Sequence, residues 1–110
     1  MKKDPLLRVE DIYESILAIQ EYLEGMDKEA FLANREKQDA VLRRLAVIGE
    51  AVKKLAAEFR EQHPHIPWKD IAGTRDVVVH DYDGVNLHII WNIVRNELPP
   101  LAEKLRPLLD

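Results

Sequence analysis

An arginine, a histidine and a tyrosine stand close together in residues 75–82, which read RDVVVHDY. Arg75 carries a permanently charged, planar fork that can bind a phosphate through two hydrogen bonds. His80 can both accept and donate a proton near neutral pH, and Tyr82 adds a hydroxyl that can be hydrogen-bonded or modified. The three residue types at this spacing predict phosphate chemistry, with Arg75 and His80 as the catalytic pair.

The spacing of this motif also limits how it can act. On one straight helix, His80 lies five positions after Arg75, which corresponds to a rotation of about 140° and a rise of about 7.5 Å. Two arrangements could still aim both side chains at one phosphate. Either the helix loosens near the valines, or the arginine of one subunit meets the histidine of another across a two-fold axis. If the helix continues, Tyr82 returns to almost the same face as Arg75.

The first third of the chain has the spacing of amphipathic helices. Asp4 and Pro5 predict an N-cap and a first helical residue, and Gly25 predicts the end of that helix. Between them, apolar residues recur at steps of three and four: Val9, Ile12, Ile16, Ile19 and Leu23. Asp27 can cap a short second helical turn.

A long helix is predicted from Asn34 to about Glu61, because Pro64 and Pro67 follow. Its main apolar seam consists of Val41, Leu45, Ile48, Val52, Leu55 and Phe59, and a second seam of Leu42, Ala46 and Gly49 lies beside it. A helix with this much apolar surface usually packs on more than one neighbour. The second seam could therefore be a subunit interface.

The segment from Trp68 towards His80 is predicted to be a helix preceded by Pro67. Gly73 disfavours a helix by about 1 kcal/mol relative to alanine, and the three valines at 77–79 favour a strand. The helix is preferred because no second strand is evident to pair with this segment. Asp83-Gly84 then predicts a turn.

The last part of the chain is predicted to hold two helices. An apolar face runs over residues 89–98, and Pro99-Pro100 are expected to interrupt it before a final helix. The predicted fold is all-α: one domain over residues 1–110, built as a compact antiparallel bundle of four or five helices.

Composition narrows the function. The chain has 110 residues, no cysteine and a formal net charge of −4. It contains no apolar run of about 18 residues, so a cytoplasmic protein without membrane partners is expected. The acidic balance argues against a general nucleic-acid coat, so no DNA partner is expected and any RNA would be held by a local cluster.

Other chemistry-bearing residues give weaker indications. His63, His65 and His88 have no cysteine or carboxylate at matched spacing, so no metal and no cofactor are expected. Trp68 and Trp91 are expected to be core anchors. The basic residues of the long helix are expected to form a solvated face, part of which could guide RNA: Arg43, Arg44, Lys53, Lys54 and Arg60.

These elements together resemble the HepT toxins of the HEPN superfamily, over nearly the whole chain. The resemblance rests on Ile48-Gly49-Glu50-Ala51, Ile66-Pro67-Trp68, Ile71, Gly73, Arg75, His80, Tyr82, Trp91 and Leu98-Pro99.

The resemblance implies an all-helical homodimer in which two copies of the arginine and histidine face one cleft. It also implies a metal-independent ribonuclease whose partner is a minimal nucleotidyltransferase antitoxin, with Tyr82 as the residue that receives AMP. Most such toxins have asparagine at the position of Asp76. The negative charge of Asp76 beside a phosphate site is expected to affect the catalytic rate rather than the fold. Independently of the resemblance, Glu50 stands beside Gly49 inside an otherwise apolar seam. It is assigned a supporting role, lining the cleft or holding Arg75, and a solvated helix position is an equal alternative.

The predicted function is the toxin of a type II or type VII-like toxin–antitoxin system, an endoribonuclease acting on an RNA such as tRNA or mRNA. The alternative is a non-catalytic helical dimer that binds a nucleotidyltransferase or RNA, and Asp76 is its main support.

Overall fold

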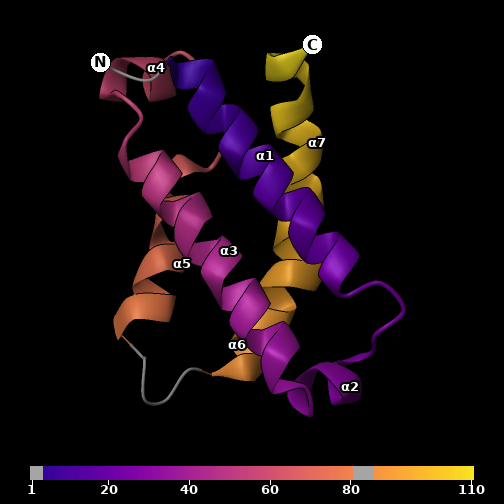
Figure 1. Ribbon diagram of the computed structural model, residues 1–110. Coiled ribbons are helices and arrows are strands. Elements are labelled where there is room, and N and C mark those ends of the chain that lie inside the picture. Colours follow the sequence, from indigo (N-terminus) through magenta and orange to yellow (C-terminus); the bar gives the residue numbers. More distant parts are fainter. Residues whose placement is uncertain (1–3, 81–85) are drawn as a thin grey trace.

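Helices make up all the regular structure in the described part of the chain. The computed structural model describes residues 4–80 and 86–110, with side chains for residues 4–74 and 86–110. The elements in chain order are α1 (Pro5–Tyr22), α2 (Lys28–Leu32), α3 (Arg35–Lys53), α4 (Ala57–Glu61), α5 (Trp68–His80), α6 (Leu87–Asn92), the π-helical η1 (Ile93–Glu97) and α7 (Leu98–Leu109) (Figure 1). The all-α prediction is confirmed.

Three helix starts lie where short polar residues predict them. The Asp4 carboxylate accepts a hydrogen bond from the Leu6 amide at 2.8 Å, and Asp27 accepts one from Ala30 at 2.8 Å. Asn34 Oδ1 accepts one from the Lys37 amide at 3.0 Å. Each side chain thereby satisfies an amide that has no acceptor within its own helix.

Gly25 turns the chain after α1. Its φ is 77°, in the left-handed region that side chains with a Cβ disfavour. The predicted stop at Gly25 is therefore confirmed, although the helix itself ends three residues earlier, at Tyr22.

The prediction of one long helix from Asn34 to Glu61 is wrong, because the helix is broken between Lys53 and Ala57. α3 ends at Lys53, Ala56 has the extended backbone of ψ 143°, and α4 begins at Ala57. The turn lets Leu55 reach the core at 3% exposure and brings the Phe59 ring within 6.2 Å of the Trp68 ring. Apolar periodicity missed the break because Leu55 and Phe59 continue the three- and four-residue spacing of the apolar residues of α3.

α5 is helical throughout, as predicted, despite Gly73 and the valines. Trp68 begins it, and the indole Nε1 of this residue donates hydrogen bonds to the carbonyl oxygens of His63, at 3.0 Å, and Arg60, at 3.2 Å. These bonds attach the start of α5 to the loop that follows α4.

The end of the chain differs from the prediction. Pro99 and Pro100 do not interrupt the helical path: η1 leads directly into α7, and both prolines lie in the first turn of α7. A proline ring collides with the carbonyl four residues earlier in an α-helix. The wider π-helical turn over residues 93–97 changes the hydrogen-bond pattern just before the prolines, so the path stays helical.

A single core holds the bundle together. α3 packs against both α1 and α5, and α1 also packs against α7. The fully buried side chains at the centre are Val9, Ile12, Ile16, Ile19, Phe31, Val41, Leu45, Ile48, Val52, Ile90 and Leu105. Figure 1 shows α1 and α3 crossing the molecule, with α7 beside α1 and α5 beside α3. No helix in the described ranges is long and apolar enough to cross a membrane.

Two glycines offer a matched test of the backbone. A Cβ built at either Gly25 or Gly73 meets no atom within 4 Å, but only Gly25 has a positive φ. Gly25→Ala should therefore lower the free energy of unfolding by about 1–2 kcal/mol. Gly73→Ala should raise it by about 0.5–1 kcal/mol, because alanine restricts the unfolded chain and favours the helix. Urea unfolding of both variants measures the difference. A destabilising Gly73→Ala would indicate that another chain fills the space beside that residue.

Candidate functional site

The predicted catalytic motif lies on α5. The backbone of this helix includes Arg75, Asp76 and His80, with His80 as its last residue. Tyr82 and the predicted Asp83-Gly84 turn lie outside the described residues.

The helical backbone from Trp68 to His80 excludes one of the two arrangements that the sequence left open. Because α5 is an α-helix over this whole range, the arrangement in which it loosens near the valines is wrong. The Cα positions of Arg75 and His80 are then separated by about 140° around the helix and about 7.5 Å along it. Within one copy of α5, the two residues do not share a face.

The first two turns of α5 are packed against the rest of the protein. Trp68 is 6% exposed, Ile71 is 4% exposed and Thr74 is buried. The Thr74 hydroxyl donates a 2.7 Å hydrogen bond to the Ile71 carbonyl, which satisfies a buried polar group inside the helix. The motif begins at the very next residue, so its first position rests on an anchored turn.

Glu50, the predicted supporting residue, is half-buried on α3 and lines a groove of about 420 Å³ between α1 and α3. We call this the α1–α3 groove; its lining comprises Arg8, Asp11, Arg43, Ala46, Val47, Glu50, Ala51 and Lys54. None of the described residues that line this groove belongs to the motif, so both predictions for Glu50, that it lines the catalytic cleft or holds Arg75, stay predictions.

The groove also shows how the second apolar seam of α3 is used. Ala46 lines the groove, Leu42 is half-buried and Gly49 is buried. The second seam therefore lies partly in the protein interior, at Gly49, and partly on an open surface, at Ala46. That surface combines small apolar residues with charges of both signs.

Two residues of this groove, Arg8 and Asp11, were missed from the sequence. The Nε atom of Arg8 is buried and has no hydrogen-bond partner among the described residues. Both residues neighbour buried positions of α1, Val9 and Ile12, but nothing in the one-dimensional pattern says which helix lies opposite.

The five basic residues that were predicted to form one solvated face have different surroundings in the structure. Arg43 and Lys54 line the α1–α3 groove, whereas Arg44 Nε donates to the Tyr22 hydroxyl at 3.2 Å. The Nε of Arg60 is buried and the Arg60 carbonyl accepts from the Trp68 indole. The prediction of a single solvated face is wrong for Arg44 and Arg60.

Both tryptophans pack on the core, as predicted. Trp91 is half-buried, and its ring lies 5.4 Å from that of Phe31. The Arg95 guanidinium lies 4.6 Å from the Trp91 ring and also donates a 2.5 Å hydrogen bond to the Met26 carbonyl. Trp91 therefore helps to fix the α1–α2 connection onto α6 and η1.

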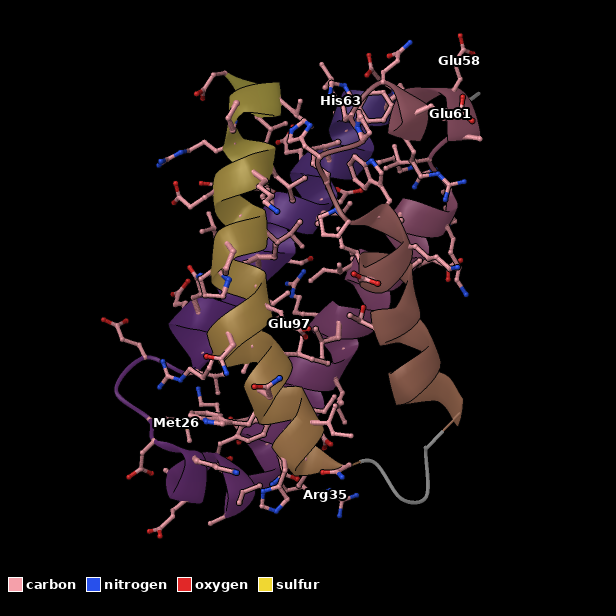
Figure 2. The ribbon with its side chains drawn as sticks, turned by 180° about the vertical axis from the view of Figure 1, so that it is seen from behind. Met26, Arg35, Glu58, Glu61, His63 and Glu97 are labelled. Atoms are coloured by element: carbon pink, nitrogen blue, oxygen red, sulfur yellow. The ribbon has the colours of Figure 1, made fainter. Side chains whose placement is uncertain are left out.

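A second cavity, of about 230 Å³, lies between α5 and the η1–α7 segment. We call it the α5–α7 pocket. Its lining comprises Pro67, Asp70, Ile71, Thr74, Ile93, Glu97, Leu98, Pro100, Leu101 and Lys104. Figure 2 shows Glu97 on the side of the C-terminal helical column that looks towards α5.

No metal cluster is evident in the described part of the chain, where no three His, Asp or Glu residues converge. His63 and His65, considered above as metal ligands, have ring centroids 6.2 Å apart, and the His63 ring also lies 4.8 Å from the Phe59 ring.

Comparison with known proteins identifies the family. A family model described as "Ribonuclease HepT-like" matches residues 12–108. A protein of Caldanaerobacter subterraneus named "Putative RNase" is 40% identical over 98% of this chain and 96% of its own length. One of Thermococcus cleftensis named "Probable ribonuclease HepT" is 38% identical over 98% of both chains.

A further relative is longer. The chain is 40% identical over its full 110 residues to a Methanocaldococcus jannaschii protein named "Gamma-glutamylcyclotransferase and putative RNase", and it spans 50% of that protein's length. No solved structure matches significantly. Because the family model covers nearly all of the chain and two of these relatives align over almost their entire length, the chain belongs to the HepT-like ribonuclease family.

Proposed function

We propose that this protein is a metal-independent endoribonuclease that acts as a homodimer, with residues 1–110 forming one catalytic domain. The observation that carries the proposal is the continuous helix α5, which separates Arg75 from His80 around its circumference. A second copy of α5, related by a two-fold axis, can supply the missing partner. An isologous contact would create two such composite sites in one cleft.

The proposed chemistry uses the ribose 2′-hydroxyl as the nucleophile. One His80 removes its proton as the 2′-oxygen bonds to phosphorus, and the bond from phosphorus to the 5′-oxygen breaks. A protonated His80 donates a proton to that departing oxygen. Arg75 stabilises the negative charge that gathers on the phosphorus-bound oxygens. The products are a 2′,3′-cyclic phosphate and a 5′-hydroxyl, and two histidines in one cleft can divide the roles of base and acid.

The α1–α3 groove supports the proposed dimer. Its small residues Ala46, Val47 and Ala51 permit close approach of another chain, and its rim carries both cations and carboxylates. A two-fold contact places the same surface on both sides, so charges of opposite sign can face each other across the axis.

The proposed regulation follows from the family. As the toxin of a type II or type VII-like toxin–antitoxin system, the protein would be neutralised by a nucleotidyltransferase that transfers AMP to Tyr82. The adduct would bring an anionic phosphate and a purine close to Arg75 and exclude the RNA phosphate by charge and bulk. A cytoplasmic RNA such as tRNA or mRNA is the proposed target.

A second candidate is a non-catalytic dimer that binds the nucleotidyltransferase or RNA. Asp76 favours it, because a carboxylate next to Arg75 in sequence repels a substrate phosphate. The two candidates differ in whether growth arrest and RNA cleavage require His80.

Catalysis can be tested at both motif residues. Arg75→Ala and His80→Ala should each lower RNA cleavage by about 100-fold or more, because a general base and a charge-stabilising group contribute on that order. Cleavage by the wild type should persist in excess chelator and leave 2′,3′-cyclic phosphate ends. Arg35→Ala and His65→Ala remove the same groups at exposed positions and serve as controls. Undiminished cleavage by the His80 variant would refute the mechanism.

The composite site has its own test, in which the two inactive variants are mixed. If Arg75 of one subunit acts with His80 of the other, each mixed dimer regains one of its two sites, and random exchange should restore about a quarter of wild-type activity. Subunits would be exchanged by mild denaturation and refolding, and cleavage measured against each variant treated alone. Light scattering that shows a monomer at micromolar concentration would refute the composite site. No recovery in a dimer would mean either that both groups of a site belong to one chain or that each site needs both His80 side chains, one as base and one as acid.

Regulation can be tested at Tyr82. Tyr82→Phe should keep most of the ribonuclease activity but escape neutralisation, because the ring remains while the nucleophilic oxygen is lost. Wild type and variant would be incubated with the cognate nucleotidyltransferase and ATP, and the intact chains weighed. Tyr13→Phe, on α1, is the matched control and should still gain AMP. Transfer of AMP to the Tyr82 variant would show that this hydroxyl is not the acceptor.

A further inference from the structure

The α5–α7 pocket lies directly beside the motif but contains none of its residues. Asp70, Ile71 and Thr74 line it from α5, and Arg75 follows Thr74 in the chain. The opposite wall comes from η1 and α7. A ligand in this pocket would therefore lie next to the start of the motif.

The size of the pocket limits its occupant. Pockets for drug-sized ligands commonly enclose about 300–1,000 Å³, and this one encloses about 230 Å³. Its floor is apolar: Ile71 and Leu98 are almost fully buried, and Pro67 and Pro100 line the same space. A flat, largely apolar ring system fits these dimensions, whereas a whole nucleotide would leave its sugar and phosphate outside.

The polar groups around the pocket select the kind of ring. Asp70 and Glu97 provide carboxylates, which accept hydrogen bonds when ionised, and Lys104 provides a donor. The Thr74 hydroxyl already gives its proton to the Ile71 carbonyl, so it can only accept from a ligand. The lining therefore suits a ring edge with neighbouring N–H donors and one carbonyl oxygen. Among the RNA bases, guanine has that edge, with N1–H, the N2 amino group and O6.

We propose that the α5–α7 pocket binds a guanine base of the RNA next to the cleaved phosphate, with Asp70 and Glu97 accepting from N1–H and the amino group and Lys104 donating to O6. This inference rests on the proposed ribonuclease function and deepens it. A base held here leaves its phosphate on the side of α5 where Arg75 follows Thr74. The pocket would thus set both the register of the RNA and a preference for guanine.

The test measures binding without requiring cleavage. Isotope-labelled full-length protein would be titrated with each of the four nucleoside 3′-monophosphates, and the shifted amide signals assigned by NMR. Guanosine 3′-monophosphate should bind at least about fivefold more tightly than the other three, as expected for a matched pair of hydrogen bonds. The largest shifts should fall on Ile71, Thr74, Leu98 and Leu101.

Variants identify the groups responsible. Asp70→Asn and Glu97→Gln keep the side-chain size but remove the acceptor charge, so each should reduce the preference for guanosine at least about fivefold. Glu103→Gln is the matched control: Glu103 is exposed on the same helix as Lys104, outside the pocket lining, and pairs with Arg106 at 3.0 Å. It should leave binding unchanged.

The outcomes separate the pocket from the proposed activity. Equal binding of all four nucleotides, or shifts confined to other surfaces, overturns the guanine pocket even if RNA is cleaved in a His80-dependent way. Guanosine-selective shifts in the pocket that both variants abolish support it, even if no cleavage is found and the proposed function fails. In an active protein, mapped cut sites should also carry guanine at one fixed position beside the cleaved bond.

Discussion

The packing of α5 against α3 is the constraint on which the site depends. It is anchored at Trp68, whose ring is buried while its N–H donates to two carbonyls of the preceding loop. A buried indole N–H without a partner would be costly, so the loop after α4 and the start of α5 are tied together. Ile71 and Thr74 continue the buried face and determine which side of α5 meets the core.

The regular backbone of α5 also keeps Arg75 and His80 on different faces within one chain. Positions 75 and 80 lie about 140° apart on any regular α-helix, whatever its orientation, and the α-helical backbone of α5 is maintained through the valines. β-branched residues lower helix propensity only modestly. The tertiary contacts of Trp68, Ile71 and Thr74 at the start of α5 help to offset that cost. The separation of Arg75 from His80 is therefore a property of a regular helix.

Two breaks in regular α-helical structure position the elements that pack around α5. The break after Lys53 turns α4 back so that Phe59 packs near Trp68. The π-helical turn at residues 93–97 precedes the prolines of α7 and carries Ile93 and Glu97, which line the α5–α7 pocket. π-Helical turns often occur at functional sites, and this one forms a wall of the cavity nearest the motif.

By itself, the sequence determined the fold class, three helix caps, the turn at Gly25 and the helical nature of α5, because each depends on local hydrogen bonds, backbone preference or apolar periodicity. It also singled out Arg75 and His80 by residue type and spacing, Asp76 by its departure from the family pattern, and Glu50 by its place in an apolar seam. Only the tertiary structure decided where the predicted long helix breaks. Leu55 and Phe59 continue the apolar spacing of α3, so this spacing is the same whether the helix continues or breaks. Likewise, Arg8 and Asp11 join Glu50 only because α1 packs against α3. Asp70 and Glu97 share a pocket across 27 residues of sequence because α5 lies beside the η1–α7 segment, and no local pattern encodes that contact.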